Sequence, residues 1–169
     1  VGTATALLEK DDGLASYDVW AVAQDLQGGM WFGGTDGTID GGEVCNLSRF
    51  NGQQFTTVRE VNGMVTELMR ERGGNIWIAT DRNGVYRFDG EGYTHFTSKD
   101  LGANSTWGLG EDRDGGIWIG TSEGVSYYDG SGFFFCEGRR CLIGQRKHHS
   151  TGRHGQVLVR DLRRWGDAL

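Results

Sequence analysis

Short stretches of alternating apolar and polar residues recur along this chain, joined by turns rich in glycine and acidic residues. The clearest unit is a Gly turn, an apolar residue, a tryptophan, another apolar residue and small residues, and it occurs at 27–35, 73–80 and 114–121. Two apolar runs joined by a short turn with Gly and Asp are typical of a β-hairpin. No window shows the 3.6-residue apolar period of a helix, so the pattern predicts an all-β chain.

A second hairpin follows each of these units. The segments 46–55, 84–93 and 124–133 each carry an apolar-aromatic strand that ends in Asn-Gly or Asp-Gly, which is turn chemistry that accepts positive φ. The predicted repeats of four short strands cover 19–58, 65–96 and 106–136. Four strands in about forty residues is the signature of a propeller blade. We therefore expect a β-propeller fragment, with about three four-stranded antiparallel blades plus a partial preceding blade.

The two ends of the chain differ from the repeats. Residues 10–20 parallel 98–107, so we expect 1–18 to hold the end of a preceding blade and its connector. Residues 1–135 carry 9 basic and 20 acidic residues, whereas residues 136–169 carry 8 and 3. Such a shift marks a boundary. We expect 137–169 to be a divergent basic tail, disordered or out of frame, in which 156–162 can add one strand or a short helix.

Composition narrows the classes of function. No apolar run in the 169 residues approaches the roughly 20 that cross a bilayer, so we expect membrane attachment only through a parent chain. The chain begins at Val1 without a visible signal peptide, which favours a processed product or an excised piece. The basic tail lacks a recognisable fold or an aromatic platform for nucleic acid, and we expect no nucleic-acid partner.

The cysteines and histidines of the tail invite a zinc interpretation. They have no CxxC pair and no clean ligand spacing, so we expect no metal and no cofactor. Cys136 and Cys141 are close enough in sequence to pair, and the count leaves their disulfide open. The residues concerned are Cys136, Cys141, His148, His149 and His154.

Residues that recur in every copy are expected to build the blade. The tryptophans lie mid-strand, 46 and 41 residues apart, and large aromatic side chains dominate burial. An acidic residue six positions before each tryptophan is expected to close an Asx turn, because a calcium loop at 112–115 would lack its remaining ligands. The expected structural residues are Trp31, Trp77, Trp118, Gly28, Gly74 and Gly115, with the acids Asp25, Glu71 and Asp112.

Trp20 and Trp107 are equivalent positions at the start of the first strand of a blade, where the middle copy has Thr66. This position lies close to the central funnel of a propeller. An aromatic face there matches the aliphatic face of a sugar ring, so a stacking platform is one interpretation. Core packing is the other, and we favour it because large apolar side chains are mostly buried.

The most individual feature is an insertion at 36–46, where the equivalent loops are 81–83 and 122–123. In a four-stranded blade this loop shares one end with the connectors 59–64 and 97–105. Loops clustered at one end of a rigid scaffold usually carry recognition, although a solvated variable loop is the alternative for any single residue. The candidates for ligand or partner binding are Asp36, Asp40, Glu43, Arg59, Arg82, Lys99 and Asn104.

With the repeats laid out, the chain resembles the two-component regulator propeller family over about 10–135. The segments DGLASYDVWAVAQDLQGGMWFGGT and VTELMRERGGNIWIATDRNGVYRFDG match the family's strand, acid, Gly turn, "lWiGT" strand and "rfdg" turn. The resemblance implies a periplasmic or extracellular sensor ectodomain of a bacterial hybrid histidine kinase or a related signalling protein. It implies a small-molecule ligand, often carbohydrate-derived, and no catalytic residue.

Three blades cannot close a ring of four to eight, so we expect the remaining blades of a parent protein, or a homodimer, as partners. A protein-interaction scaffold without a small ligand is an alternative. A propeller enzyme similar to streptogramin lyase is another. It would need a positioned base and a metal site, and His95 is the sole histidine of the repeats.

Overall fold

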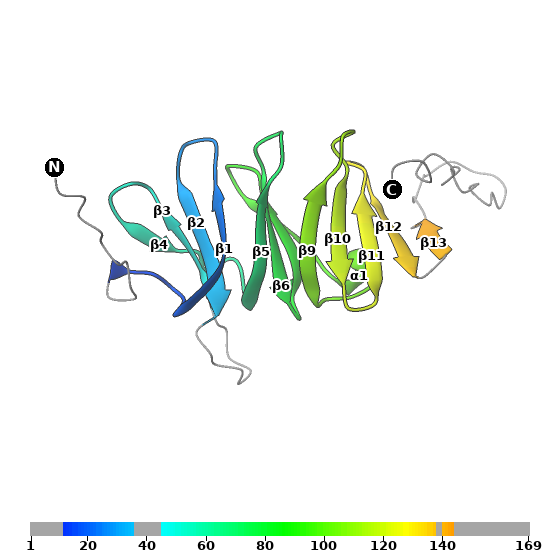
Figure 1. Ribbon diagram of the computed structural model, residues 1–169, viewed down its shortest axis with the longest axis horizontal. Coiled ribbons are helices and arrows are strands. Elements are labelled where there is room, and N and C mark those ends of the chain that lie inside the picture. Colours follow the sequence, from blue (N-terminus) through cyan, green and yellow to red (C-terminus); the bar gives the residue numbers. More distant parts are fainter. Residues whose placement is uncertain (1–11, 36–44, 138–139, 144–169) are drawn as a thin grey trace.

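The structure, a computed structural model, describes residues 12–35, 45–137 and 140–143. They form three antiparallel sheets that stand side by side (Figure 1). Blade 1 contains β1 (Asp18–Gln24), β2 (Met30–Thr35), β3 (Leu47–Phe50) and β4 (Phe55–Thr57). Blade 2 contains β5 (Met64–Arg70), β6 (Ile76–Asp81), β7 (Gly84–Phe88) and β8 (Tyr93–Phe96). Blade 3 contains β9 (Thr106–Glu111), β10 (Ile117–Thr121), β11 (Gly124–Tyr128) and β12 (Phe133–Glu137).

The strands of each blade pair in chain order, so the sheets are meanders. This arrangement confirms the all-β propeller-blade fold expected from the repeated hairpins. Two elements were not expected. The short helix α1 (Ser98–Leu101) lies in the connector between blades 2 and 3. A fifth strand, β13 (Arg140–Ile143), adds to blade 3 beside β12, with Cys136 aligned to Cys141 in the register.

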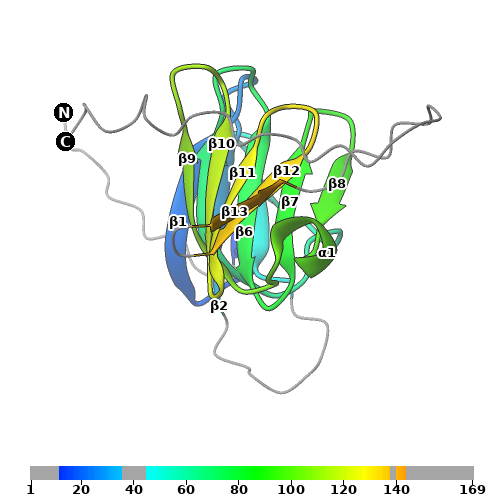
Figure 2. The same ribbon diagram turned by 90° about the vertical axis from the view of Figure 1, so that its right-hand side faces the viewer.

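The apolar core lies between the blades. In β6, Ile76 and Ile78 belong to the cluster shared with blade 1, while Trp77 and Ala79 belong to the cluster shared with blade 3. All four side chains are fully buried. A strand buried on both faces carries apolar residues at every position, whereas a half-buried strand alternates. The middle blade is therefore covered on both faces, and Figure 2 shows the three sheets overlapping along the stack.

The two ends of the sheets differ in the chain that they carry. The β1–β2, β5–β6 and β9–β10 turns lie together at the upper end in Figure 1, which we name the turn end. The opposite end, named the connector end, holds the 81–83 and 122–123 turns and the connectors 58–63 and 97–105. Hydrogen bonds join these pieces: Asn83 Nδ2 donates to Asn62 O (3.2 Å), and Ser122 N donates to Ser105 O (2.9 Å).

Candidate functional site

The repeated tryptophans lie on the blade face that meets the next blade. Trp31 and Trp77 are 1% and 0% exposed, and Trp77 contacts Phe96 and Tyr128 with ring centroids 5.7 and 5.5 Å apart. Trp118 lies on the equivalent face of blade 3 and is half-buried. These indoles fill the space between sheets, so they are unavailable to a ligand in blades 1 and 2.

Each of these indoles also donates a hydrogen bond to the acid six residues earlier. Trp31 Nε1 donates to Asp25 Oδ2 (2.9 Å), Trp118 Nε1 donates to Asp112 Oδ2 (3.2 Å), and Trp77 Nε1 donates to Glu71. The other oxygen of Asp25 accepts from the backbone N–H of Gly29 (2.8 Å), as in an Asx turn. The acid therefore satisfies a buried indole N–H and closes the turn at once. The six-residue spacing was visible in the sequence, but its indole partner was missed.

The electrostatics of Asp25 follow from these bonds. The carboxyl is buried, which raises its pKa, but hydrogen bonds from Arg49, Trp31 and Gly29 outweigh burial and lower the pKa below its usual range. Arg49 Nε lies 2.6 Å from Asp25 Oδ2. Asp112 follows the same pattern: burial raises its pKa, while bonds from Gly116, Trp118 and others lower it overall. Both groups are held as structural anions.

The first strand of every blade carries a β-bulge at the same place. The register of β1 with β2 skips Trp20, that of β5 with β6 skips Thr66, and that of β9 with β10 skips Trp107. A bulge leaves one residue outside the ladder and re-aims its side chain, and bulges are frequent beside binding sites. The sequence analysis aligned these three positions but did not predict the bulges.

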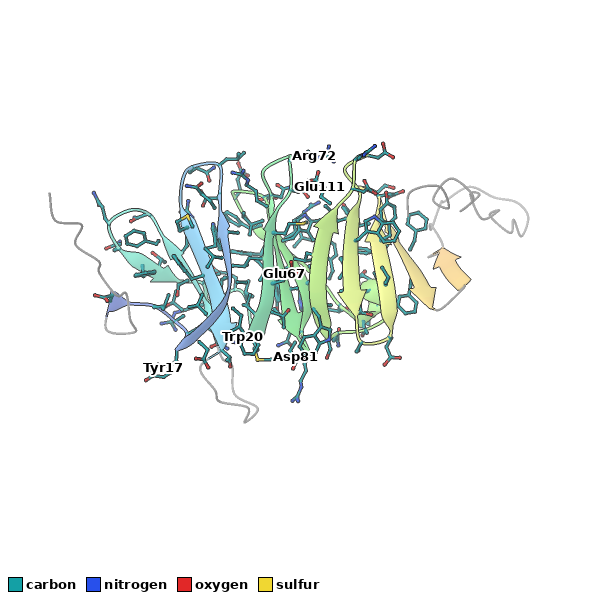
Figure 3. The ribbon with its side chains drawn as sticks, in the orientation of Figure 1. Tyr17, Trp20, Glu67, Arg72, Asp81 and Glu111 are labelled. Atoms are coloured by element: carbon teal, nitrogen blue, oxygen red, sulfur yellow. The ribbon has the colours of Figure 1, made fainter. Side chains whose placement is uncertain are left out.

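The two bulge tryptophans are exposed. Trp20 is 54% and Trp107 is 52% exposed, which contradicts core packing, the interpretation that the sequence favoured. Figure 3 shows Trp20 toward the connector end, the end at which Tyr17 and Asp81 are also labelled. Trp20 lies at the bulge, and its neighbour Ala21 is buried while the indole itself stays exposed.

An open hollow of about 560 Å³ lies at the connector end between blades 2 and 3. It brings together two residues that the sequence singled out, Arg82 and Asn104. Arg82 is 73% exposed, lies 3.6 Å (Nε) from Asp81 Oδ2, and has a positive φ of 71°. Further lining residues are Ser105, Ser122, Glu123 and Phe135.

Asn104 also has a structural contact. Asn104 Oδ1 accepts a hydrogen bond from Ser98 N (2.5 Å), so that oxygen already closes the connector around α1. Arg59 and Lys99 are exposed on connector segments and do not line the hollow. Asp36, Asp40 and Glu43 lie outside the described residues.

A second hollow of about 740 Å³ lies at the outer edge of blades 1 and 2 and includes Glu60, Tyr93 and His95. His95 stacks on Tyr86, with ring centroids 4.0 Å apart, and its Nε2 lies 2.6 Å from Asn83 O. Burial and the nearby Glu60 raise the pKa of Tyr93 far above its usual value, with Arg49 opposing them. The contacts with Tyr86 and Asn83 hold the imidazole of His95 against the blade.

Neither a metal-binding cluster nor a membrane-spanning helix is found in the described residues. Within the part of the chain that the structure describes, no group of three or more His, Cys, Asp or Glu side chains is arranged to hold a metal ion. In that same part, no helix has the length and apolar character needed to cross a membrane.

Comparison with known proteins gives one match at the level of sequence. Residues 100–123 match the family model described as two component regulator propeller. This segment contains the end of α1, the strands β9 and β10 and the turn between them, and it confirms the resemblance seen in the repeats. No curated protein matches the chain.

Solved structures show the same fold. The extracellular domain assigned to the hybrid two component system BT3049 of B. thetaiotaomicron is 24% identical, with a TM-score of 0.64 over 77% of this chain and 18% of that one. PorZ of the type-IX secretion system of Porphyromonas gingivalis is 19% identical, with a TM-score of 0.52 over 69% and 18%. A catalytically inactive virginiamycin B lyase from Staphylococcus aureus, solved with quinupristin, is 14% identical, with a TM-score of 0.54 over 75% and 44%. The chain thus spans under a fifth of the first two proteins.

Proposed function

We propose that this chain is a non-catalytic sensing module of a bacterial two-component receptor, and that its connector end binds a small, carbohydrate-like ligand. The hollow between blades 2 and 3 carries the proposal, because it joins the exposed cation of Arg82 to polar groups of the next blade. Ser105, which lines the hollow, is two residues before the exposed Trp107. Charged, polar and aromatic groups on loops of a rigid scaffold are the usual components of a binding site.

The segment match supports the signalling role, since it names the two component regulator propeller. The likeness to an extracellular domain of a hybrid two component system agrees with a periplasmic or extracellular position. A ligand that binds one arrangement of such an ectodomain better than another shifts the population between them. A change in blade packing is then the signal that passes to the rest of the receptor.

A lyase-like activity is the second candidate, because a virginiamycin B lyase shares the fold. A general base must reach the proton that it removes. His95 instead stacks on Tyr86 and contacts Asn83 O on the outer edge of the blade. We therefore favour binding without catalysis. Turnover of quinupristin by the chain would overturn this choice.

The binding proposal is tested by calorimetric titration of the chain with a panel of neutral and acidic oligosaccharides. The informative variant is Arg82→Gln, which removes the cation at the hollow and leaves a shorter, neutral polar side chain. Its matched control is Arg72→Gln, an exposed arginine at the turn end (Figure 3). We expect Arg82→Gln to weaken binding about tenfold and Arg72→Gln to leave it unchanged. Absence of any heat of binding across the panel would contradict the proposed function.

A further inference from the structure

The three β-bulges at the inner strands present a row of side chains that blade building does not explain. Trp20, Thr66 and Trp107 occupy the bulged position of β1, β5 and β9. Strands β1 and β9 each pack beside β5, so Thr66 stands between the two indoles in the row. We propose that the two indoles are the walls of a saccharide-binding slot that crosses blade 2, with Thr66 as its floor.

The exposure of Trp20 does not arise from the absence of a blade after blade 1. Trp20 belongs to blade 1, and blade 2 packs directly on that blade through the cluster containing Ala21 and Val65. With blade 2 in place, Trp20 remains 54% exposed, close to the 52% of Trp107 on the last blade. The two positions thus share both the bulge and a similar exposure. Two indoles left about half exposed forgo part of their burial gain, and exposed aromatic surface of this kind is typical of a contact with a partner.

Thr66 is a short side chain on the strand between those that carry the two indoles. Its hydroxyl donates to Thr106 O at 2.7 Å, which ties the short side chain to the next blade. A third indole at this position would occupy the volume above β5. In this proposal the small threonine of the middle copy separates the two indoles and so forms the slot. A large side chain there would give one continuous aromatic surface.

The surroundings of the row identify the class of ligand. The two indoles offer flat apolar faces, which match the C–H face of a pyranose ring. Polar groups accompany them: Glu67 lies on β5 next to Thr66, with its Oε2 accepting from Leu109 N at 2.7 Å. Asp81 lies at the same end as Trp20 (Figure 3). Carboxylates accept hydrogen bonds from hydroxyl donors. A neutral oligosaccharide of two or more rings has both C–H faces and hydroxyl donors, and it can place one ring on each indole.

This inference rests on the proposed function and specifies the residues and the ligand class. Its test uses the 169-residue chain and four neutral hexasaccharides, namely maltohexaose, cellohexaose, xylohexaose and mannohexaose. Acrylamide quenching of tryptophan fluorescence reports which indoles meet solvent, and calorimetry gives the affinity. We expect one hexasaccharide to reduce the quenching, because it covers Trp20 and Trp107.

Variants separate the slot from other sites. Trp20→Ala and Trp107→Ala should each weaken binding about tenfold, and Trp20→Tyr should retain most of it because a flat ring remains. Thr66→Trp should weaken binding comparably by filling the slot. The control is Tyr17→Ala, which removes an aromatic side chain 72% exposed just outside the bulge and should change nothing. Circular dichroism verifies that each variant is folded.

The outcomes distinguish the two levels of the proposal. If no hexasaccharide shields the wild-type indoles or gives a heat of binding, the slot is wrong, while an acidic saccharide bound through Arg82 would keep the broader function. If a hexasaccharide binds and the alanine variants bind equally well, the slot alone is wrong. If Thr66→Trp binds as tightly as the wild type, the ligand does not cross blade 2 and the slot is also wrong.

Discussion

The tryptophans between the blades and those at the bulges show two uses of one residue type in one repeat. Trp31 and Trp77 lie on β2 and β6, within the ladder, and are 1% and 0% exposed. Trp20 and Trp107 lie on the neighbouring strands β1 and β9, outside the ladder, and are about half exposed. Their places in the blade differ: Trp31 and Trp77 lie on the face that meets the next sheet, whereas Trp20 and Trp107 lie at the bulges of the inner strands.

This contrast separates the parts of the repeat that build the propeller from those that can vary. The buried position is Trp in all three copies and has a carboxylate partner each time. The bulged position is Trp, Thr and Trp, without effect on the blade. Among the three copies, the residue differs at the bulge of the inner strand and is the same on the face between the sheets.

The largest expected effect comes from emptying the space between blades 2 and 3. Trp77→Ala removes a fully buried indole that contacts Phe96 and Tyr128 and should lower the free energy of unfolding by about 3–5 kcal/mol. Urea unfolding followed by far-UV circular dichroism measures the loss. A loss below about 1 kcal/mol would show that this interface does not hold the blades together.

Removing the negative charge of Asp25, which accepts the hydrogen bond of the Trp31 indole, should have the next largest effect. Asp25→Asn breaks the ion pair with Arg49 and weakens the bond to the indole, with an expected loss of about 2 kcal/mol at neutral pH. The folded-state pKa of Asp25 lies below the usual 3.8, so its stabilisation is present above pH 3.8 and declines as pH falls through the folded value. The gap between wild type and Asp25→Asn should narrow below pH 3.8. A gap that is constant with pH would contradict the role of the charge.

A smaller effect is expected at the turn end, where Arg72 joins blades 2 and 3. Arg72 Nε lies 3.0 Å from Glu111 Oε1, its Nη1 donates to Arg113 O at 3.1 Å, and its Nη2 donates to Asp112 O. The side chain is 61% exposed, so solvent screens the pair. Arg72→Gln should cost about 0.5–1 kcal/mol by thermal or urea unfolding. A loss as large as that of Trp77→Ala would contradict the expectation that the buried core contributes more to stability than this exposed ion pair.

The smallest effect should come from the bulge itself. Trp20→Ala removes an indole that is 54% exposed and lies outside the core clusters, so its unfolding free energy should stay within about 0.5 kcal/mol of the wild type. The same urea titration serves as the measurement. If Trp20→Ala destabilises as strongly as Trp77→Ala, the bulged indole is a structural residue and the contrast between the two regions disappears.

Hairpin spacing was sufficient to predict the blades, because turn glycines and strand alternation are local signals. The strands β5–β8 extend over 64–96 and β9–β12 over 106–137, where the hairpin spacing places two of the repeats. Burial of Trp31 and Trp77 followed from their apolar neighbours. The strand β13 was missed, because RCLI sits in a basic segment without alternation and pairs only through contact with β12.

The site was less predictable, since it depends on pairing between strands. Trp20 reads as part of an alternating strand, and the skipped residue is visible only when β1 is aligned against β2. Asn104 was predicted as a ligand residue, yet its Oδ1 holds the connector through Ser98. Arg82 lies at the connector end because its turn is beside the connectors, and its role in ligand binding stays a prediction.

One spectrum compares both regions at once. The chain contains six tryptophans, which can be labelled with 5-fluorotryptophan and assigned by single Trp→Phe variants. During titration with the hexasaccharide that binds, the ¹⁹F resonances of Trp20 and Trp107 should shift, and those of Trp31 and Trp77 should stay in place. Shifts confined to Trp31 and Trp77, or spread equally over all four, would contradict a ligand held at the bulges.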